Sequence, residues 1–154
     1  PILKDNNLVS LIKDNIKLIN ELDDRIIINF KTKKSDILLN SDSEQLSRVF
    51  FNLIKNSIES IQDKKIDNID LIGKIDISIS ENTERISFII IDNGLGFRIF
   101  ADNIKDILNP YFTTKKKGTG LGLSIVNKII NDHNGKINFV SLEYGAKIEI
   151  IFIK

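Results

Sequence analysis

Three glycines at alternate positions lead directly into an amphipathic helix within residues 109–130, and this segment constrains the chain more than any other. Gly118, Gly120 and Gly122 allow the backbone to approach a ligand closely. A helix begins with unpaired N–H groups and the positive end of a dipole, which suits a phosphate group. Lysines and threonines over residues 113–117 precede the glycines. Glycine patterns alone are weak evidence, so a solvated turn before a helix stays open as the alternative.

The composition is that of an ordinary soluble globular domain. The chain has 154 residues, 42% of them hydrophobic and 28% charged, enough for one domain with its own core. The net charge of +1 argues against broad binding to nucleic acid or an anionic membrane. Without cysteine and with a single histidine, disulfides and histidine-rich metal sites are excluded. No apolar run approaches the roughly 20 residues of a membrane span.

Hydrophobic periodicity predicts an α/β sandwich in which helices cover one face of a largely antiparallel sheet. We expect helices over 8–22, 43–62 and 121–132, and strands over 25–31, 36–40, 74–80, 85–91, 136–142 and 147–153. The strands are expected to form hairpins in the order in which they follow one another. Ser41 or Asp42 is the expected cap of the long helix. The weakly patterned residues between Phe97 and Lys117 indicate a functional lid or mobile loop.

The long helix carries a polar stripe. Asn52, Asn56 and Glu59 are spaced four and three apart and share one side of the helix. Asparagine side-chain oxygens suit Mg²⁺, which shares its shell with substrate phosphates. Solvated asparagines are the alternative. The buried side is expected to consist of Leu46, Val49, Phe50, Leu53 and Ile61.

A second polar feature follows the apolar strand that ends in IIID. Asp92 stands at the strand end, and Gly94 and Gly96 come directly after it. A carboxylate placed there can accept a hydrogen bond from an exocyclic amine, such as that of adenine. An ordinary Asp-Asn-Gly turn would give the same pattern.

Four motifs together are more specific than any one of them: NLIKN at 52–56, DNGLG at 92–96, PYFTTK at 110–115 and GTGLG at 118–122. Their order resembles the ATP-binding catalytic domain of sensor histidine kinases, in the superfamily that includes gyrase-type ATPases and Hsp90 chaperones. The resemblance covers about residues 40–153 and is strongest to the nitrogen-regulation sensor kinases. It implies the Bergerat-type fold, a mixed, largely antiparallel sheet of about five strands covered on one face by about three helices.

The resemblance also implies the ligands, ATP and Mg²⁺, and roles for the long helix. Asn56 would ligate Mg²⁺, Asn52 would support the metal and phosphates, and Lys55 would contact phosphate, so these three are the candidate catalytic residues. The role of Glu59 is open: it would either orient metal-bound water or pair with a lysine of the lid. Gyrase-like relatives have a glutamate at the position of Asn52, so its absence favours transfer to a protein over hydrolysis.

The remaining site residues are assigned by the same resemblance. Asp92 would bind the adenine amino group, while Gly94 and Gly96 would let the ring pack against backbone. Ala146 stands where many relatives have a threonine that holds water near adenine. The lid over 97–117 and the start of the last helix would complete the nucleotide site through Phe112, Thr113, Thr114, Lys115, Gly118, Gly120, Leu121, Gly122 and Leu123.

The resemblance implies a larger protein around this chain. The phosphoryl acceptor would be a histidine on a separate dimerisation domain, with residues 1–7 as the linker from it and 8–154 as the catalytic domain. The single histidine, His133, is expected to be structural. The absence of Met also favours a segment of a longer chain. A response regulator would act downstream.

These inferences predict the catalytic domain of a two-component sensor histidine kinase, which transfers the γ-phosphoryl of Mg-ATP. We expect a cytoplasmic, monomeric segment that contacts neither nucleic acid nor membrane, in a homodimeric parent anchored in a bacterial inner membrane. Two alternatives stay open: a nucleotide-sensing module of the same fold without transfer activity, and an anti-sigma-type serine kinase.

Overall fold

The core of the fold is a sheet whose three central strands bury alternate side chains. The computed structural model describes residues 1–96 and 122–154. Five strands form the sheet in the order β2-β4-β5-β7-β6. Their bounds are β2 Ile27–Thr32, β4 Lys74–Glu81, β5 Arg85–Asp92, β6 Gly135–Leu142 and β7 Gly145–Ile153. Only the β2–β4 pair is parallel among these neighbours, so the sheet is mixed and largely antiparallel.

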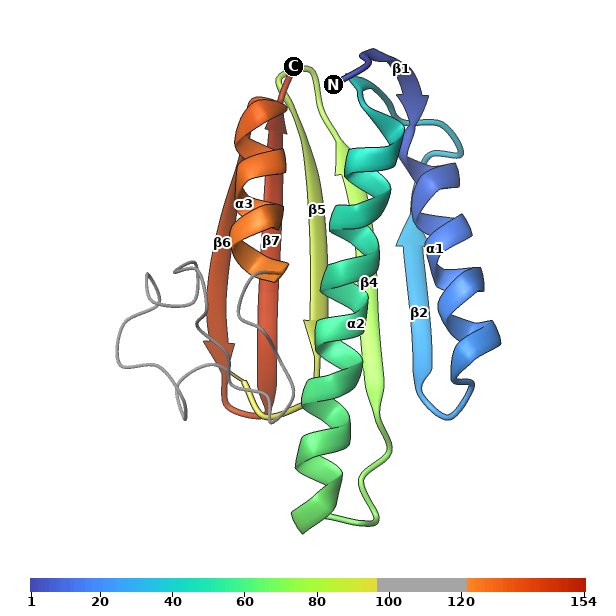
Figure 1. Ribbon diagram of the computed structural model, residues 1–154, viewed down its shortest axis with the longest axis vertical. Coiled ribbons are helices and arrows are strands. Elements are labelled where there is room, and N and C mark those ends of the chain that lie inside the picture. Colours follow the sequence, from blue (N-terminus) through green and yellow to red (C-terminus); the bar gives the residue numbers. More distant parts are fainter. Residues whose placement is uncertain (97–121) are drawn as a thin grey trace.

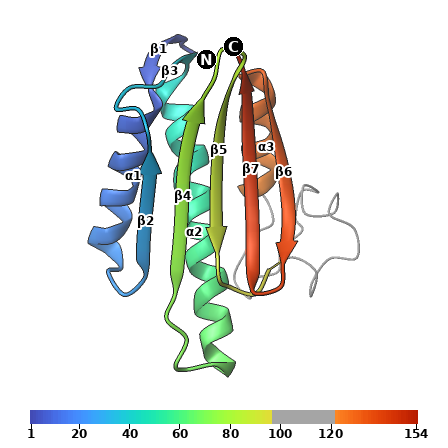
Figure 2. The same ribbon diagram turned by 180° about the vertical axis from the view of Figure 1, so that it is seen from behind.

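Three helices lie on one face of this sheet and leave the other face uncovered (Figures 1 and 2). They are α1 Leu8–Leu22, α2 Ser43–Asp67 and α3 Gly122–Asp132. The aromatic rings of Phe50 on α2 and Phe88 on β5 pack 4.9 Å apart, and Val126 on α3 is also fully buried. This two-layer arrangement confirms the predicted fold class. Within the described residues, no helix combines the length and apolar character that a membrane span requires.

The long helix begins and packs as its sequence predicts. Asp42 is its N-cap, and its side chain accepts a hydrogen bond from the Gln45 N–H at 3.1 Å. All five predicted core residues of this helix are buried. The helix continues to Asp67, five residues beyond the predicted end, where the Asn68 N–H bonds to the Lys64 carbonyl at 3.1 Å. Residues 63–67 lack apolar spacing, so periodicity did not reveal this extension.

The predicted hairpin of residues 25–40 is wrong. β2 pairs in parallel with β4, while β3 (Leu38–Ser41) pairs antiparallel with β1 (Lys4–Asn7) in a separate two-stranded sheet. The chain turns away at Ile37, which is buried and whose N–H donates to the Asn7 side chain at 3.1 Å. Two strand-like runs around a polar turn predict strands but do not specify their partners. The hairpins β4–β5 and β6–β7 form as predicted.

Candidate functional site

Asp92 is a buried carboxylate at the end of β5, with 7% of its surface exposed. Its Oδ1 accepts a hydrogen bond from the Gly94 N–H at 2.9 Å. The Ser57 hydroxyl and the Ala146 N–H also donate to this side chain. Burial raises the pKa of Asp92 above its usual range, and the hydrogen bonds, together with the charge of Lys64, oppose that rise only in part. A carboxyl group is therefore buried among several hydrogen-bond donors.

The turn after Asp92 packs directly against α2. A Cβ on Gly94 would lie 2.8 Å from the backbone carbonyl carbon of Ser60, so only glycine fits without a shift. The Leu95 N–H donates to the Ser60 hydroxyl at 2.9 Å. Gly96 has a φ of 79°, in the left-handed region, and faces the Gly145 carbonyl. The glycines of DNGLG thus serve close packing within the protein itself.

The predicted polar stripe lies on α2 beside this turn. Asn52, Asn56 and Glu59 are all half-buried, whereas Lys55 is exposed. The Lys55 Nζ lies 3.9 Å from Glu59 Oε1, one helical turn away. In the described part of the chain, Glu59 therefore has an ionic partner on its own helix. The sequence analysis had left the role of Glu59 open.

A second stripe on α2 was missed by the sequence reasoning. Ser57, Ser60 and Lys64 are three and four residues apart and all contact Asp92 or its turn. The Lys64 ammonium donates to the carbonyl oxygens of Asn93 at 3.0 Å and of Gly94 at 3.2 Å. The helical spacing was visible in the sequence, but the helix was expected to end before residue 64.

Asn93 fixes the other side of the same turn. Its Oδ1 accepts from the Lys74 N–H at 2.9 Å, and its Nδ2 donates to the Ile72 carbonyl at 2.9 Å. The turn is thereby tied to the start of β4 as well as to α2. Asn93 was read only as a turn residue in the sequence, because an amide next to Asp-Gly is common in turns.

The described site residues come from three elements. Asp92, Gly94 and Gly96 lie at the end of β5 beside α2, and α3 directs its N-terminus toward the end of the sheet where β5 ends (Figure 1). Gly122 and Leu123 begin α3, and a Cβ on Gly122 would meet no atom of the described residues within 4 Å. The remaining predictions lie outside the described residues, namely the lid over 97–117 with Phe112, Thr113, Thr114 and Lys115, and the loop residues Gly118, Gly120 and Leu121.

His133 connects the end of α3 to the start of α2. It is 7% exposed, its Nδ1 lies 2.7 Å from the Ile129 carbonyl oxygen, and its Nε2 accepts from the Asp42 N–H at 3.0 Å. A carbonyl on one nitrogen and an N–H on the other assign a neutral ring with its proton on Nδ1. Both ring nitrogens form hydrogen bonds within the protein, which agrees with the expected structural role of His133.

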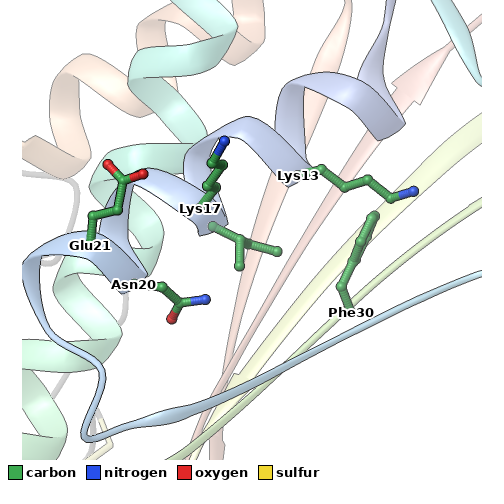
Figure 3. A pocket seen from close by; sticks show the side chains of 6 residues that line it. Lys13, Lys17, Asn20, Glu21 and Phe30 are labelled. Atoms are coloured by element: carbon green, nitrogen blue, oxygen red, sulfur yellow. The ribbon is translucent and has the colours of Figure 1, made fainter.

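An open recess lies elsewhere, between α1 and β2 (Figure 3). Its volume is about 600 Å³, and it is lined by Lys13, Ile16, Lys17, Asn20, Glu21 and Phe30. Of the predicted site residues that the structure describes, none lines this recess. The edge of the sheet at β2 is therefore separate from the Asp92 site.

Residues 41–154 match the model of the histidine kinase-, DNA gyrase B- and HSP90-like ATPase family. The chain belongs to this family. Its members named as kinases include a sensor histidine kinase of Rickettsia felis described as NtrY-like, 34% identical over 96% of this chain, and sporulation kinase A of Bacillus subtilis, 38% identical over 84% of it. The predicted similarity to nitrogen-regulation-like sensor kinases is confirmed by these relatives.

Solved structures of this ATPase family agree with the sequence relatives. The catalytic domain of histidine kinase ThkA, in a nucleotide-free form, has a TM-score of 0.83 and 30% identity, and the match covers 99% of this chain and 95% of that one. The chain is therefore a histidine-kinase-type ATPase catalytic domain. It spans only 23% of the NtrY-like relative and 20% of sporulation kinase A.

Proposed function

We propose that this domain binds Mg-ATP and supplies its γ-phosphoryl group to a histidine on a dimerisation domain outside this chain. The observation that carries the proposal is the Asp92 site: a buried carboxylate beside a tightly packed glycine turn, in an ATPase family. A buried acceptor held by several donors is suited to recognise one polar edge of a bound base.

Adenine recognition would rest on Asp92. The ionised carboxylate accepts a hydrogen bond from the exocyclic amine of adenine, whereas guanine presents a carbonyl oxygen at that position. Two acceptors facing each other in a buried site are unfavourable, so the site discriminates against guanine nucleotides. Gly94 and Gly96 would let the adenine ring pack against backbone.

Metal and phosphate binding would rest on α2 and the start of α3. Asn56 would hold Mg²⁺ through its amide oxygen, with Asn52 supporting it and Lys55 as a phosphate contact. No group of three histidine, cysteine or acidic side chains that could hold a metal occurs among the described residues, which fits a metal held by amide oxygen and nucleotide phosphate. When bound, Mg²⁺ neutralises phosphate charge. Gly122 and Leu123, with the lid and loop residues named above, would contact the phosphates.

The acceptor and partners belong to the rest of the parent protein. His133 is buried with both ring nitrogens engaged, so it is unsuited to accept phosphoryl. ThkA, at 26% identity, has been solved in complex with a response regulator protein. We propose a homodimeric parent with a dimerisation domain that carries the acceptor histidine, and a response regulator downstream. A cytoplasmic position next to a membrane anchor belongs to the same proposal.

The metal assignment is tested with Asn56→Ala. We expect this variant to bind an ATP analogue with Mg²⁺ about 10-fold more weakly than wild type, because one metal ligand is lost, and to bind equally without Mg²⁺. Calorimetric titration with and without Mg²⁺ measures both values. Equal binding by the two proteins in the presence of Mg²⁺ would contradict the assignment of Asn56 as a metal ligand.

Phosphoryl transfer is tested separately with the full-length parent and γ-labelled ATP. We expect acid-labile, base-stable label on the dimerisation domain. Tight nucleotide binding without any label on that domain would instead establish a nucleotide-sensing module without transfer activity.

A further inference from the structure

Lys64 reaches from α2 to the turn that follows Asp92. The residue is half-buried, and its ammonium group donates to two adjacent carbonyl oxygens, those of Asn93 and Gly94, at 3.0 Å and 3.2 Å. A lysine near a helix C-terminus commonly interacts with the last carbonyl groups of its own helix. Here both acceptors belong to the turn, which is more than 25 residues farther along the chain.

The contact of Lys64 is one of several that fix residues 93–95. Ser60 binds the Leu95 N–H on the α2 side, and the Asn93 side chain binds Lys74 and the Ile72 carbonyl on the β4 side. Among these contacts, Lys64 is the charged hydrogen-bond donor, and the other donors are neutral N–H groups. Hydrogen bonds from a charged donor are stronger than neutral ones, so Lys64 contributes most to the position of the Asn93 and Gly94 peptide groups.

We propose that Lys64 is a positioning residue for adenine recognition, which holds the turn behind Asp92 and places a positive charge near this carboxylate. The residue does not need to touch the nucleotide. It acts through the turn and through Asp92. This inference rests on the proposed role of Asp92 in binding adenine.

The charges around Asp92 support the second part of the inference. Hydrogen bonds from Gly94, Ser57 and Ala146 lower the pKa of Asp92 against the effect of burial, and the charge of Lys64 on α2 adds a smaller lowering. Glu59, on the neighbouring stripe of α2, is paired with Lys55. Lys74 and Lys147 adjoin the residues in register with Asp92 on β4 and β7, and strand alternation places both on the opposite face of the sheet.

The test compares Lys64→Met with Lys64→Arg and with Lys65→Met, a matched change at the next helix position. ADP binding is titrated calorimetrically from pH 5 to pH 8 for each protein and for Asp92→Asn. We expect Lys64→Met to bind ADP about 10-fold more weakly at neutral pH, because a charged hydrogen-bond donor is lost. The pH at which its binding is half lost should move upward, because the carboxylate protonates more readily without the cation.

The controls separate position from charge and from folding. Lys64→Arg should restore the wild-type pH midpoint, and Lys65→Met should match wild type in both affinity and midpoint. A Lys64→Met protein whose pH midpoint is unchanged overturns the charge contribution, and one that binds ADP like wild type while Asp92→Asn does not overturns the whole inference. Both results leave the proposed function intact. Wild-type binding that Asp92→Asn fails to weaken overturns the proposed function itself.

Discussion

Asp92 is subject to two opposing demands. Recognition of an amine requires an ionised carboxylate, yet burial disfavours that charge and raises the pKa of the residue. The Ser57 hydroxyl, the Gly94 and Ala146 N–H groups and the Lys64 ammonium oppose this effect. A charge on Asp92, as the proposed role in adenine binding requires, therefore has a cost in folding free energy.

This cost predicts a pH-dependent stability difference between wild type and Asp92→Asn. Because the pKa of Asp92 is raised on folding, the native state binds the proton more tightly than the unfolded state, and this residue's contribution to stability falls as the pH rises through that window. Asparagine cannot ionise. The variant should therefore gain stability relative to wild type between pH 4 and pH 7, as measured by urea unfolding. A difference that stays constant with pH, or that moves the other way, would contradict the buried-charge account.

Glycine positions in the two glycine motifs should respond differently to alanine. Gly94→Ala places a Cβ against the Ser60 backbone, so we expect the free energy of unfolding to fall by about 1 to 3 kcal/mol. Gly122→Ala is the matched control, because its Cβ would meet no atom of residues 1–96 and 122–154 within 4 Å. Urea unfolding of both variants checks this. Equal stability of the two would show that the turn moves aside without strain.

Residue-level prediction from the sequence was uneven for physical reasons. Asp92 was found because a strong apolar strand ends there, and Asn52 and Asn56 because amides interrupt an apolar helix. Ser57, Ser60 and Lys64 were not found, because serine and lysine are ordinary on any solvated helix surface. Their role depends on a turn far along the chain, which only the fold brings to α2.

At the level of elements, α2 organises the molecule. One side of it packs on β4 and β5 through residues such as Phe50, another side carries Asn52 and Asn56, and a third holds the Asp92 turn. Hydrophobic periodicity predicted its start and core side. It did not predict the last turn, which contains Lys64, because residues 63–67 carry a single apolar side chain, Ile66, and that side chain is exposed.

Strand pairing was the weakest part of the prediction. Six strands were expected near their observed positions, whereas β1 was not expected, because residues 1–7 were read as a linker. β2 and β3 pair with distant partners, β4 and β1, rather than with each other. Periodicity reports which side of a strand is buried and carries no information about the neighbouring strand. The short polar turn between them suggested a hairpin, whereas the buried Ile37 directs the chain into a separate two-stranded sheet.

The contact between α3 and α2 through His133 has a measurable consequence. Replacing His133 with alanine leaves the Asp42 N–H and the Ile129 carbonyl without their side-chain partner, so we expect a loss of about 2 kcal/mol in unfolding free energy. Lys128→Ala is the control on the same helix, where an exposed ion pair with Asp132 is removed and a change below about 0.5 kcal/mol is expected. Comparable losses in both variants would contradict the structural role of His133.

At the level of the whole molecule, the sheet, the three helices and their order explain why the site lies where it does. β5 ends and α3 begins toward the same end of the sheet, so the Asp92 carboxylate, proposed to bind adenine, and the start of α3, proposed to bind phosphate, share one end of the domain (Figure 1). The family resemblance of the four motifs predicted the family and the fold. The family match and the ThkA structure confirm both.

The most direct test of the account is a calorimetric titration of wild type and Asp92→Asn with non-hydrolysable ATP and GTP analogues in the presence of Mg²⁺. The account predicts that wild type prefers the adenine analogue by at least about 10-fold and that Asp92→Asn loses most of this preference, because the carboxylate accepts the adenine amine. Equal binding of both analogues by wild type, or an unchanged preference in Asp92→Asn, would contradict the assignment of Asp92 as the adenine-binding residue.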